Sequence, residues 1–139
     1  MDLQLRPVSM VEGQSVPGLP LISVIDDDES LRVALTGLVR SLGYEARAFA
    51  SAEDFLGTFM AGAVSCVISD IQMPGMSGID MLNHLAARNI DLPVIAISGR
   101  PDPTLEQKAL AAGAVCFLRK PFEADALICC LEKALTKQD

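Results

Sequence analysis

The stretch LISVIDDDES at residues 21–30 decides the fold, because it joins a five-residue run with four apolar residues to three acids. Short runs made almost entirely of apolar residues are typical of strands that are buried on both faces of a parallel sheet. Three more such runs follow, VSCVI at 64–68, PVIAI at 93–97 and AVCFL at 114–118. We therefore expect a parallel sheet at the centre of the molecule.

Helical patterns separate these expected strands. Leucines at positions 31, 35, 38 and 42 fall on one helical face, and Gly43 follows where a helix commonly ends. The other helical patterns begin with a cap at Ser51, follow the Pro74–Gly75 turn, run from about Thr104 to Ala112 and include Leu127 to Leu135. The segment YEARAF at 44–49 alternates polar and apolar residues, which indicates a fifth strand at a sheet edge. Strands alternating with helices predict an α/β fold.

Length, charge and cysteine usage narrow the class of protein. The 139 residues suffice for one domain, and we expect residues 1–19 to be a flexible leader and 20–139 to be the domain. The net charge of -7 argues against direct nucleic-acid binding. No apolar run reaches the roughly 20 residues that a membrane span needs. Four cysteines within apolar stretches, without CxxC spacing, predict reduced, buried thiols in a cytoplasmic protein.

Polar residues follow the expected strands at their carboxyl ends. Among the four apolar runs, Asp26 and Asp27 follow the one at 21–25, and Asp70 follows the one at 64–68. Ser98 follows the run at 93–97, and Lys120 follows the run at 114–118. Parallel strands present their carboxyl ends at one edge of the sheet, where ligands of such folds bind. The sequence thus predicts carboxylates, a hydroxyl and an ammonium at one edge.

Crowded carboxylates need a counter-charge. Two like charges about 4 Å apart repel by ~1 kcal/mol in water and by ~4 kcal/mol at an effective dielectric near 20. Mg²⁺ prefers a few carboxylates together with water and phosphate oxygens, and Lys120 adds a compact positive charge. The alternative for the acids at 26–28 is a helix cap that the helix dipole favours, a role that we expect of Asp28.

Four motifs resemble the receiver domain of bacterial two-component response regulators, and their wording is most similar to FixJ-like receivers. They are VIDDDES at 24–30, SDIQMPGMSG at 69–78, AISG at 96–99 and FLRKPF at 117–122. The similarity extends from about Leu21 to the C-terminus. It implies a flavodoxin-like (βα)5 three-layer sandwich with a five-stranded parallel sheet of order 2-1-3-4-5.

The resemblance also implies a metal-assisted phosphoacceptor. Asp70 would accept a phosphoryl group from a sensor histidine kinase or a phosphotransfer protein. Asp26, Asp27, Asp70 and the main-chain carbonyl of Gln72 would hold Mg²⁺. The domain would be a switch that assists its own phosphorylation and dephosphorylation, and not an enzyme in the ordinary sense.

Further roles concern the phosphoryl group and the response to it. Ser98 and Lys120 would bind the phosphoryl oxygens, and Phe117 would reorient when Ser98 moves. The Lys120–Pro121 bond is expected to be cis. The helix from Thr104, the last strand and the last helix would form the output face, because that helix has little large apolar surface to bury.

Three further residues have weaker links to the proposed chemistry. Gln72 and Arg100, each two residues after a site residue, could tune the lifetime of the phosphoryl group or simply face solvent. His84 is expected on a helix surface.

Three other functions fit less well. A phosphatase with an aspartate nucleophile would need an acid where Gln72 stands. A flavodoxin-like cofactor binder would need a Ser/Thr/Gly-rich loop where the acids stand. A degenerate receiver would have lost a site residue. The downstream partner could be another protein, an output domain of a longer regulator or a second, phosphorylated copy, and these alternatives stay open.

Overall fold

The computed structural model describes residues 19–136, so the expected leader lies outside the described residues except for Leu19. Five parallel strands form one sheet in the order β2-β1-β3-β4-β5. The strands are β1 (Leu21–Ile25), β2 (Glu45–Phe49), β3 (Cys66–Asp70), β4 (Val94–Ser98) and β5 (Cys116–Arg119). The helices are α1 (Glu29–Ser41), α2 (Ala52–Thr58), α3 (Gly78–Ala87), α4 (Pro103–Ala111) and α5 (Ala124–Thr136). The predicted strand order and the edge position of β2 are confirmed.

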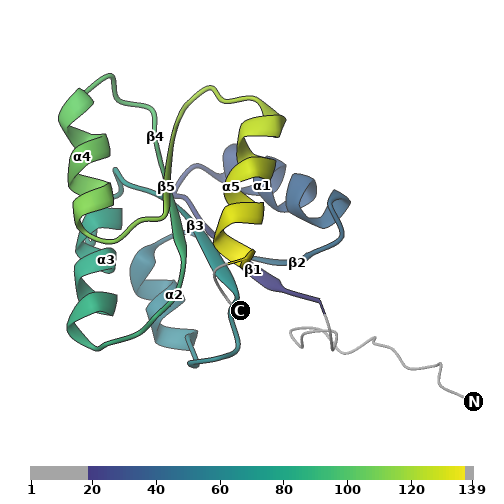
Figure 1. Ribbon diagram of the computed structural model, residues 1–139, viewed down its shortest axis with the longest axis horizontal. Helices are drawn as coiled ribbons and strands as arrows, with labels where there is room; N and C mark the ends of the chain where they lie inside the picture. Colours follow the sequence, from purple (N-terminus) through teal and green to yellow (C-terminus); the bar gives the residue numbers. More distant parts are fainter. Residues whose placement is uncertain (1–18, 137–139) are drawn as a thin grey trace, which may run out of the picture.

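The helices cover both faces of the sheet (Figure 1), which gives three layers. The α1 and α5 face is filled by alternate strand residues such as Ile22, Val24 and Ile68. The residues between them, among them Ile25 and Val67, face α2, α3 and α4. This alternation explains the apolar runs, because each central strand must supply apolar side chains to two cores.

Strand β3 differs from its expected position. The apolar run predicted residues 64–68, whereas the strand occupies Cys66–Asp70. The ladder continues through the polar residues, because Ser69 pairs with Ile25 of β1 and Asp70 pairs with Ile97 of β4. Asp70 is therefore the last residue of a central strand, and not part of the loop that follows it.

The helix ends agree with the capping residues that the sequence suggests. Asp28 accepts hydrogen bonds from the amides of Ser30 (3.0 Å) and Leu31 (3.4 Å) at the start of α1. Ser51 accepts one from the amide of Asp54 at the start of α2. Gly43, after α1, has a φ of +98°, which a residue without a Cβ adopts easily. No helix within residues 19–136 has the length and apolarity to cross a membrane.

The cysteines require one correction. All four are free thiols, but the expectation that all are buried is wrong for Cys129, which is exposed on the outer side of α5. Cys66 and Cys130 are buried, and burial raises the pKa of each thiol to about 12, with the neighbouring Cys116 contributing in both cases. Cys116 is partly exposed.

Candidate functional site

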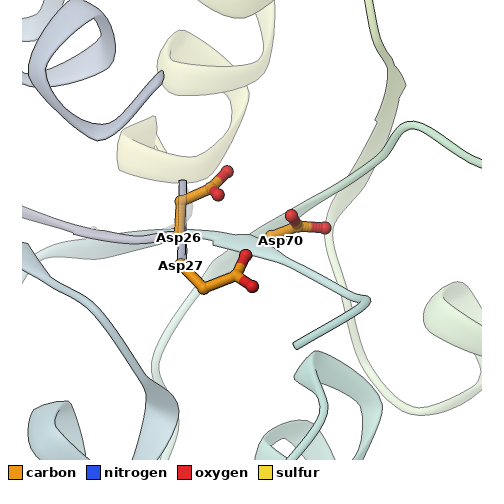
Figure 2. Close-up of side chains that lie close together, drawn as sticks. All are labelled: Asp26, Asp27 and Asp70. Carbon is orange, nitrogen blue, oxygen red and sulfur yellow. The ribbon is translucent and has the colours of Figure 1, made fainter. Parts of the chain in front are cut away.

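Three carboxylates meet where β1 and β3 end side by side (Figure 2). Asp26 and Asp27 directly follow β1, and Asp70 is the last residue of β3. Asp26 is fully buried, Asp70 is 5% exposed, and Asp27 is exposed. One oxygen from each carboxylate lies within 4.8 Å of the others. An all-oxygen donor set of this kind suits a hard divalent cation such as Mg²⁺.

The buried Asp26 is anchored by its surroundings. Its Oδ1 accepts a hydrogen bond of 2.9 Å from the amide of Asp28, and its main-chain oxygen accepts one of 2.7 Å from Nη1 of Arg32. Burial raises the pKa of Asp26; the Asp28 amide opposes this rise and the negative charge of Asp70 adds to it. The carboxylate is thus fixed in place although its charge is disfavoured.

Lys120 supplies the positive charge inside this group. Its Nζ lies 3.0 Å from Oδ2 of Asp70 and 3.3 Å from Oδ2 of Asp26. Burial alone would lower the pKa of Lys120, but the hydrogen bonds and charges of the two carboxylates outweigh it and raise the pKa. Three carboxylates and one ammonium carry a formal charge of -2, which one divalent cation neutralises. The residues therefore fit a magnesium ion in charge and in ligand type.

Gln72 connects Asp70 with Ser98. The amide of Gln72 donates to Oδ1 of Asp70 at 3.1 Å, and its side-chain oxygen accepts a bond of 2.8 Å from the buried hydroxyl of Ser98. The amide of Arg100 donates to the same hydroxyl oxygen at 3.1 Å. Ser98 thus lies at the site with its proton directed to Gln72.

Phe117 lies on β5 beside the site. Its half-buried ring packs with the core under α3 and α4. The guanidinium carbon of Arg119 lies 5.4 Å from the ring centroid, and Nη2 of Arg119 lies 3.6 Å from Oε1 of Glu106 on α4. The Lys120–Pro121 peptide bond that follows is cis, as predicted. A chain of contacts therefore links Phe117 to α4.

Comparison with known families decides what kind of domain this is. The family model for the response regulator receiver domain matches residues 22–132. The chain belongs to this family. The fold and the family that the sequence predicts are thereby confirmed.

Curated relatives of the receiver come from bacteria. Nodulation protein W of Bradyrhizobium diazoefficiens is 42% identical over 108 residues, which are 78% of this chain and 48% of that protein. The transcriptional regulatory protein FixJ of the same organism is 37% identical over 118 residues, covering 85% of this chain and 58% of FixJ. The receiver therefore spans about half the length of these two-component regulators.

Solved structures show the same fold. The crystal structure of FixJ-N has a TM-score of 0.77 and 34% identity, and the match covers 84% of this chain and 94% of FixJ-N. The structure of response regulator StyR has a TM-score of 0.80 and 38% identity, with 86% of this chain and 60% of StyR covered.

The structure assigns supporting roles that the sequence alone did not reveal. A Cβ on Gly78 would lie 2.6 Å from the main-chain oxygen of Asp70, so the start of α3 packs directly on the end of β3. Glu53 of α2 accepts a hydrogen bond of 3.0 Å from the amide of Met76 and so holds the loop after β3. Gly78 closes the motif at 69–78 and could have been singled out there, whereas Glu53 stands in no motif.

The side chains of Arg100 and His84 both lie on the protein surface. The exposed Arg100 reaches the site through its amide, and its side chain makes no hydrogen bond or ion pair within residues 19–136. The ring of His84 lies 3.1 Å from Nη1 of Arg88 on the exterior of α3, which agrees with the expected surface position.

Proposed function

We propose that this receiver takes a phosphoryl group onto Asp70 in a magnesium-dependent transfer from a sensor histidine kinase or a phosphotransfer protein. The observation that supports this most strongly is the contact of Lys120 with Asp70 inside a group of three carboxylates. The formal charge of -2 on this group would be neutralised by one divalent cation. Asp70 stands at the carboxyl end of β3, where 5% of it is exposed, and contacts with Lys120 and the Gln72 amide hold it in a fixed position.

The proposed metal ligands are the carboxylates of Asp26, Asp27 and Asp70 and the main-chain carbonyl of Gln72. Mg²⁺ bound there would supply positive charge to the incoming phosphoryl oxygens, the main requirement when two anions must meet. Asp26 is held by Asp28 and Arg32, so this side of the site needs little rearrangement to accept the ion.

In the proposed transfer, an oxygen of Asp70 forms a bond to phosphorus while the bond between phosphorus and the nitrogen of the donor histidine breaks. The freed imidazole keeps the electron pair and takes a proton from solvent. Lys120 moves from a carboxylate oxygen to a phosphoryl oxygen only a short distance away, so its charge stays paired throughout. Catalysis by the domain is thus mainly electrostatic positioning.

The switch is proposed to start at Ser98. Its hydroxyl leaves Gln72 and donates to the phosphoryl group, and Phe117 then turns into the space that opens. Phe117 contacts Arg119, which pairs with Glu106 of α4, so this motion reaches that helix. Helix α4 has Ala109 as its buried residue, so its displacement costs little apolar burial. We place the output surface on α4, β5 and α5.

The lifetime of the phosphoryl group is proposed to depend on Gln72 and Arg100. Gln72 already lies between Asp70 and Ser98, where its side chain can shield the phosphoryl group or orient water. The side chain of Arg100 extends from the same edge. A cytoplasmic location fits the proposed exchange with a kinase.

Incubation with acetyl phosphate and MgCl₂, followed by intact-protein mass spectrometry, tests the proposal. The wild-type receiver should gain the mass of one phosphoryl group, and Asp70→Asn should gain none. Asp91→Asn, at an exposed loop acid, is the matched control and should be labelled like wild type. Labelling of Asp70→Asn to the same extent would contradict the assignment.

The output partner is proposed from the family and the relatives. FixJ is a transcriptional regulatory protein of which this chain spans 58%, so the receiver is proposed to act on an output domain or a separate protein through the α4, β5 and α5 surface. A homodimer formed through that surface after phosphorylation is a further form of the same proposal. Size-exclusion chromatography with and without acetyl phosphate distinguishes a dimer from a monomer.

A further inference from the structure

The face of β1 and β2 that lies opposite α1 holds a cavity. Helix α2 covers this face with only seven residues, which corresponds to roughly 10 Å of helix at 1.5 Å per residue. A cavity of about 410 Å³ lies between the two strands, α2 and the loop that follows it. This volume falls within the range of small-molecule sites.

Ser23 of β1 lines this cavity and has an unusual hydroxyl group. The side chain is 1% exposed, and its Oγ has no hydrogen-bond partner within residues 19–136. Its neighbours Ile22 and Val24 face the core under α1, so strand alternation directs Ser23 to the cavity side. Buried polar side chains are nearly always hydrogen-bonded, so this hydroxyl calls for a partner inside the cavity.

Arg47 supplies a charge next to this hydroxyl. It is paired with Ser23 in the β1–β2 register, so both side chains leave the sheet on the same face, from strands about 4.8 Å apart. Among the residues that line the cavity, Arg47 alone is charged. Its guanidinium makes no ion pair or hydrogen bond within residues 19–136. A guanidinium beside a hydroxyl is a typical receptor for a carboxylate.

Three phenylalanines form a further part of the wall. The ring of Phe55 contacts that of Phe49 edge-on, with centroids 5.5 Å apart and an interplanar angle of 77°. Phe59 lies 5.4 Å from Phe55 on the other side. Phe55 thus contacts one ring on each side, and the three rings offer edges and faces against which a further ring can pack.

We propose that this cavity binds a small aromatic carboxylate, with the carboxylate on Arg47 and Ser23 and the ring against the three phenylalanines. Arg47 provides two parallel N–H donors, and the Ser23 hydroxyl donates to the same group. The cavity lies beside the amino-terminal half of β1, whereas Asp70 lies at the carboxyl edge of the sheet. None of the proposed magnesium ligands lines the cavity, so binding there does not use the Asp70 carboxylate.

An NMR titration of the ¹⁵N-labelled receiver with phenylacetate tests this proposal. We expect saturable amide shifts at Ser23, Arg47 and residues 58–64, with Asp70→Asn giving the same result. Phenylacetamide, which lacks the charge, should bind roughly tenfold more weakly, as expected when a charge-assisted bond of about 1.4 kcal/mol is lost. The absence of saturation at about 10 mM phenylacetate, equivalent to binding weaker than about 3 kcal/mol, would show that the cavity holds only water and would overturn the proposal.

Variants separate the carboxylate contact from general apolar binding. Arg47→Gln should weaken phenylacetate binding roughly tenfold and leave phenylacetamide binding unchanged, and Ser23→Ala should weaken it several-fold. Arg88→Gln, at the exposed arginine that caps the C-terminus of α3, is the matched control and should bind like wild type. Amide spectra report whether each variant is folded. Equal affinity of wild type and folded Arg47→Gln for phenylacetate would overturn the assignment of the carboxylate to Arg47.

Discussion

The hydroxyl of Ser98 donates a 2.8 Å hydrogen bond to the side-chain oxygen of Gln72, so these two side chains bind each other at the edge of the site. The amide of Gln72 meanwhile donates to Asp70. In this state Ser98 cannot direct its proton toward Asp70. A phosphoryl group on Asp70 must therefore compete with Gln72 for the same hydroxyl.

Replacement of Gln72 by methionine removes this competition while the side chain keeps its length. A neutral hydrogen bond contributes about 1 kcal/mol, so the activated arrangement should become roughly fivefold more populated before phosphorylation. Amide chemical shifts of α4 and β5 in Gln72→Met should move toward those of the phosphorylated wild type. Asn83→Ala, at an exposed position of α3, should not move them. Shifts that coincide with the unphosphorylated wild type would contradict this explanation.

Removal of the Lys120 charge should destabilise the magnesium-free receiver. Lys120→Met leaves Asp26 and Asp70 as neighbouring buried carboxylates without a counter-charge, which should lower the free energy of unfolding by about 3 kcal/mol. Urea titrations with EDTA measure this loss, and MgCl₂ should restore part of it. Lys108→Met, at an exposed lysine of α4, should change stability by less than about 0.5 kcal/mol. Equal stability of the two variants in EDTA would argue against the charge balance described above.

Two glycines should respond oppositely to alanine. Gly78→Ala places a Cβ 2.6 Å from the main-chain oxygen of Asp70, which should destabilise the fold by about 1–3 kcal/mol and displace the phosphoacceptor strand. Gly37 lies within α1 with open space around it, so Gly37→Ala should stabilise the fold by up to about 1 kcal/mol. Thermal unfolding of both variants gives the comparison, and a neutral Gly78→Ala would be inconsistent with this packing.

Two buried serines offer a second contrast of this kind. Ser23 has no hydrogen-bond partner within residues 19–136, so Ser23→Ala should raise the free energy of unfolding by about 1 kcal/mol in the absence of ligand. Ser69 donates to the main-chain oxygen of Asp70 at 2.9 Å, so Ser69→Ala should lower it by a similar amount. Urea unfolding measures both. Loss of stability in Ser23→Ala equal to that in Ser69→Ala would show that the Ser23 hydroxyl is satisfied.

Much of the fold could be predicted because buried parallel strands need apolar residues on both faces. The run at residues 21–25 coincides with β1, and the placement of Asp26, Asp70 and Lys120 at one edge follows from parallel strands ending together. The run at 64–68 misplaced β3, because hydropathy ends at the last apolar residue while the hydrogen-bond ladder continues through Asp70.

Contacts that depend on side-chain conformation could not be predicted. The hydrogen bond between Ser98 and Gln72 joins residues 26 positions apart. The sequence does not show whether the Ser98 hydroxyl points to Gln72 or to Asp70. Glu53 reaches the amide of Met76 because the fold places the first turn of α2 beside the loop that follows β3. Ser23 stands inside an apolar run, and the sequence does not show whether its hydroxyl finds a hydrogen-bond partner in the folded protein.

The central claim is that a divalent cation and Lys120 together prepare Asp70 for phosphorylation, and the magnesium dependence of labelling tests it most directly. The initial rate of phosphoryl incorporation from acetyl phosphate is measured against MgCl₂ concentration in wild type and in Asp27→Asn, whose altered side chain is exposed. The account predicts a saturable rise in wild type, no labelling in EDTA, and a half-saturating concentration roughly tenfold higher in Asp27→Asn, equivalent to about 1.4 kcal/mol of binding free energy. Labelling of Asp70 at the same rate in EDTA as in MgCl₂ would contradict it.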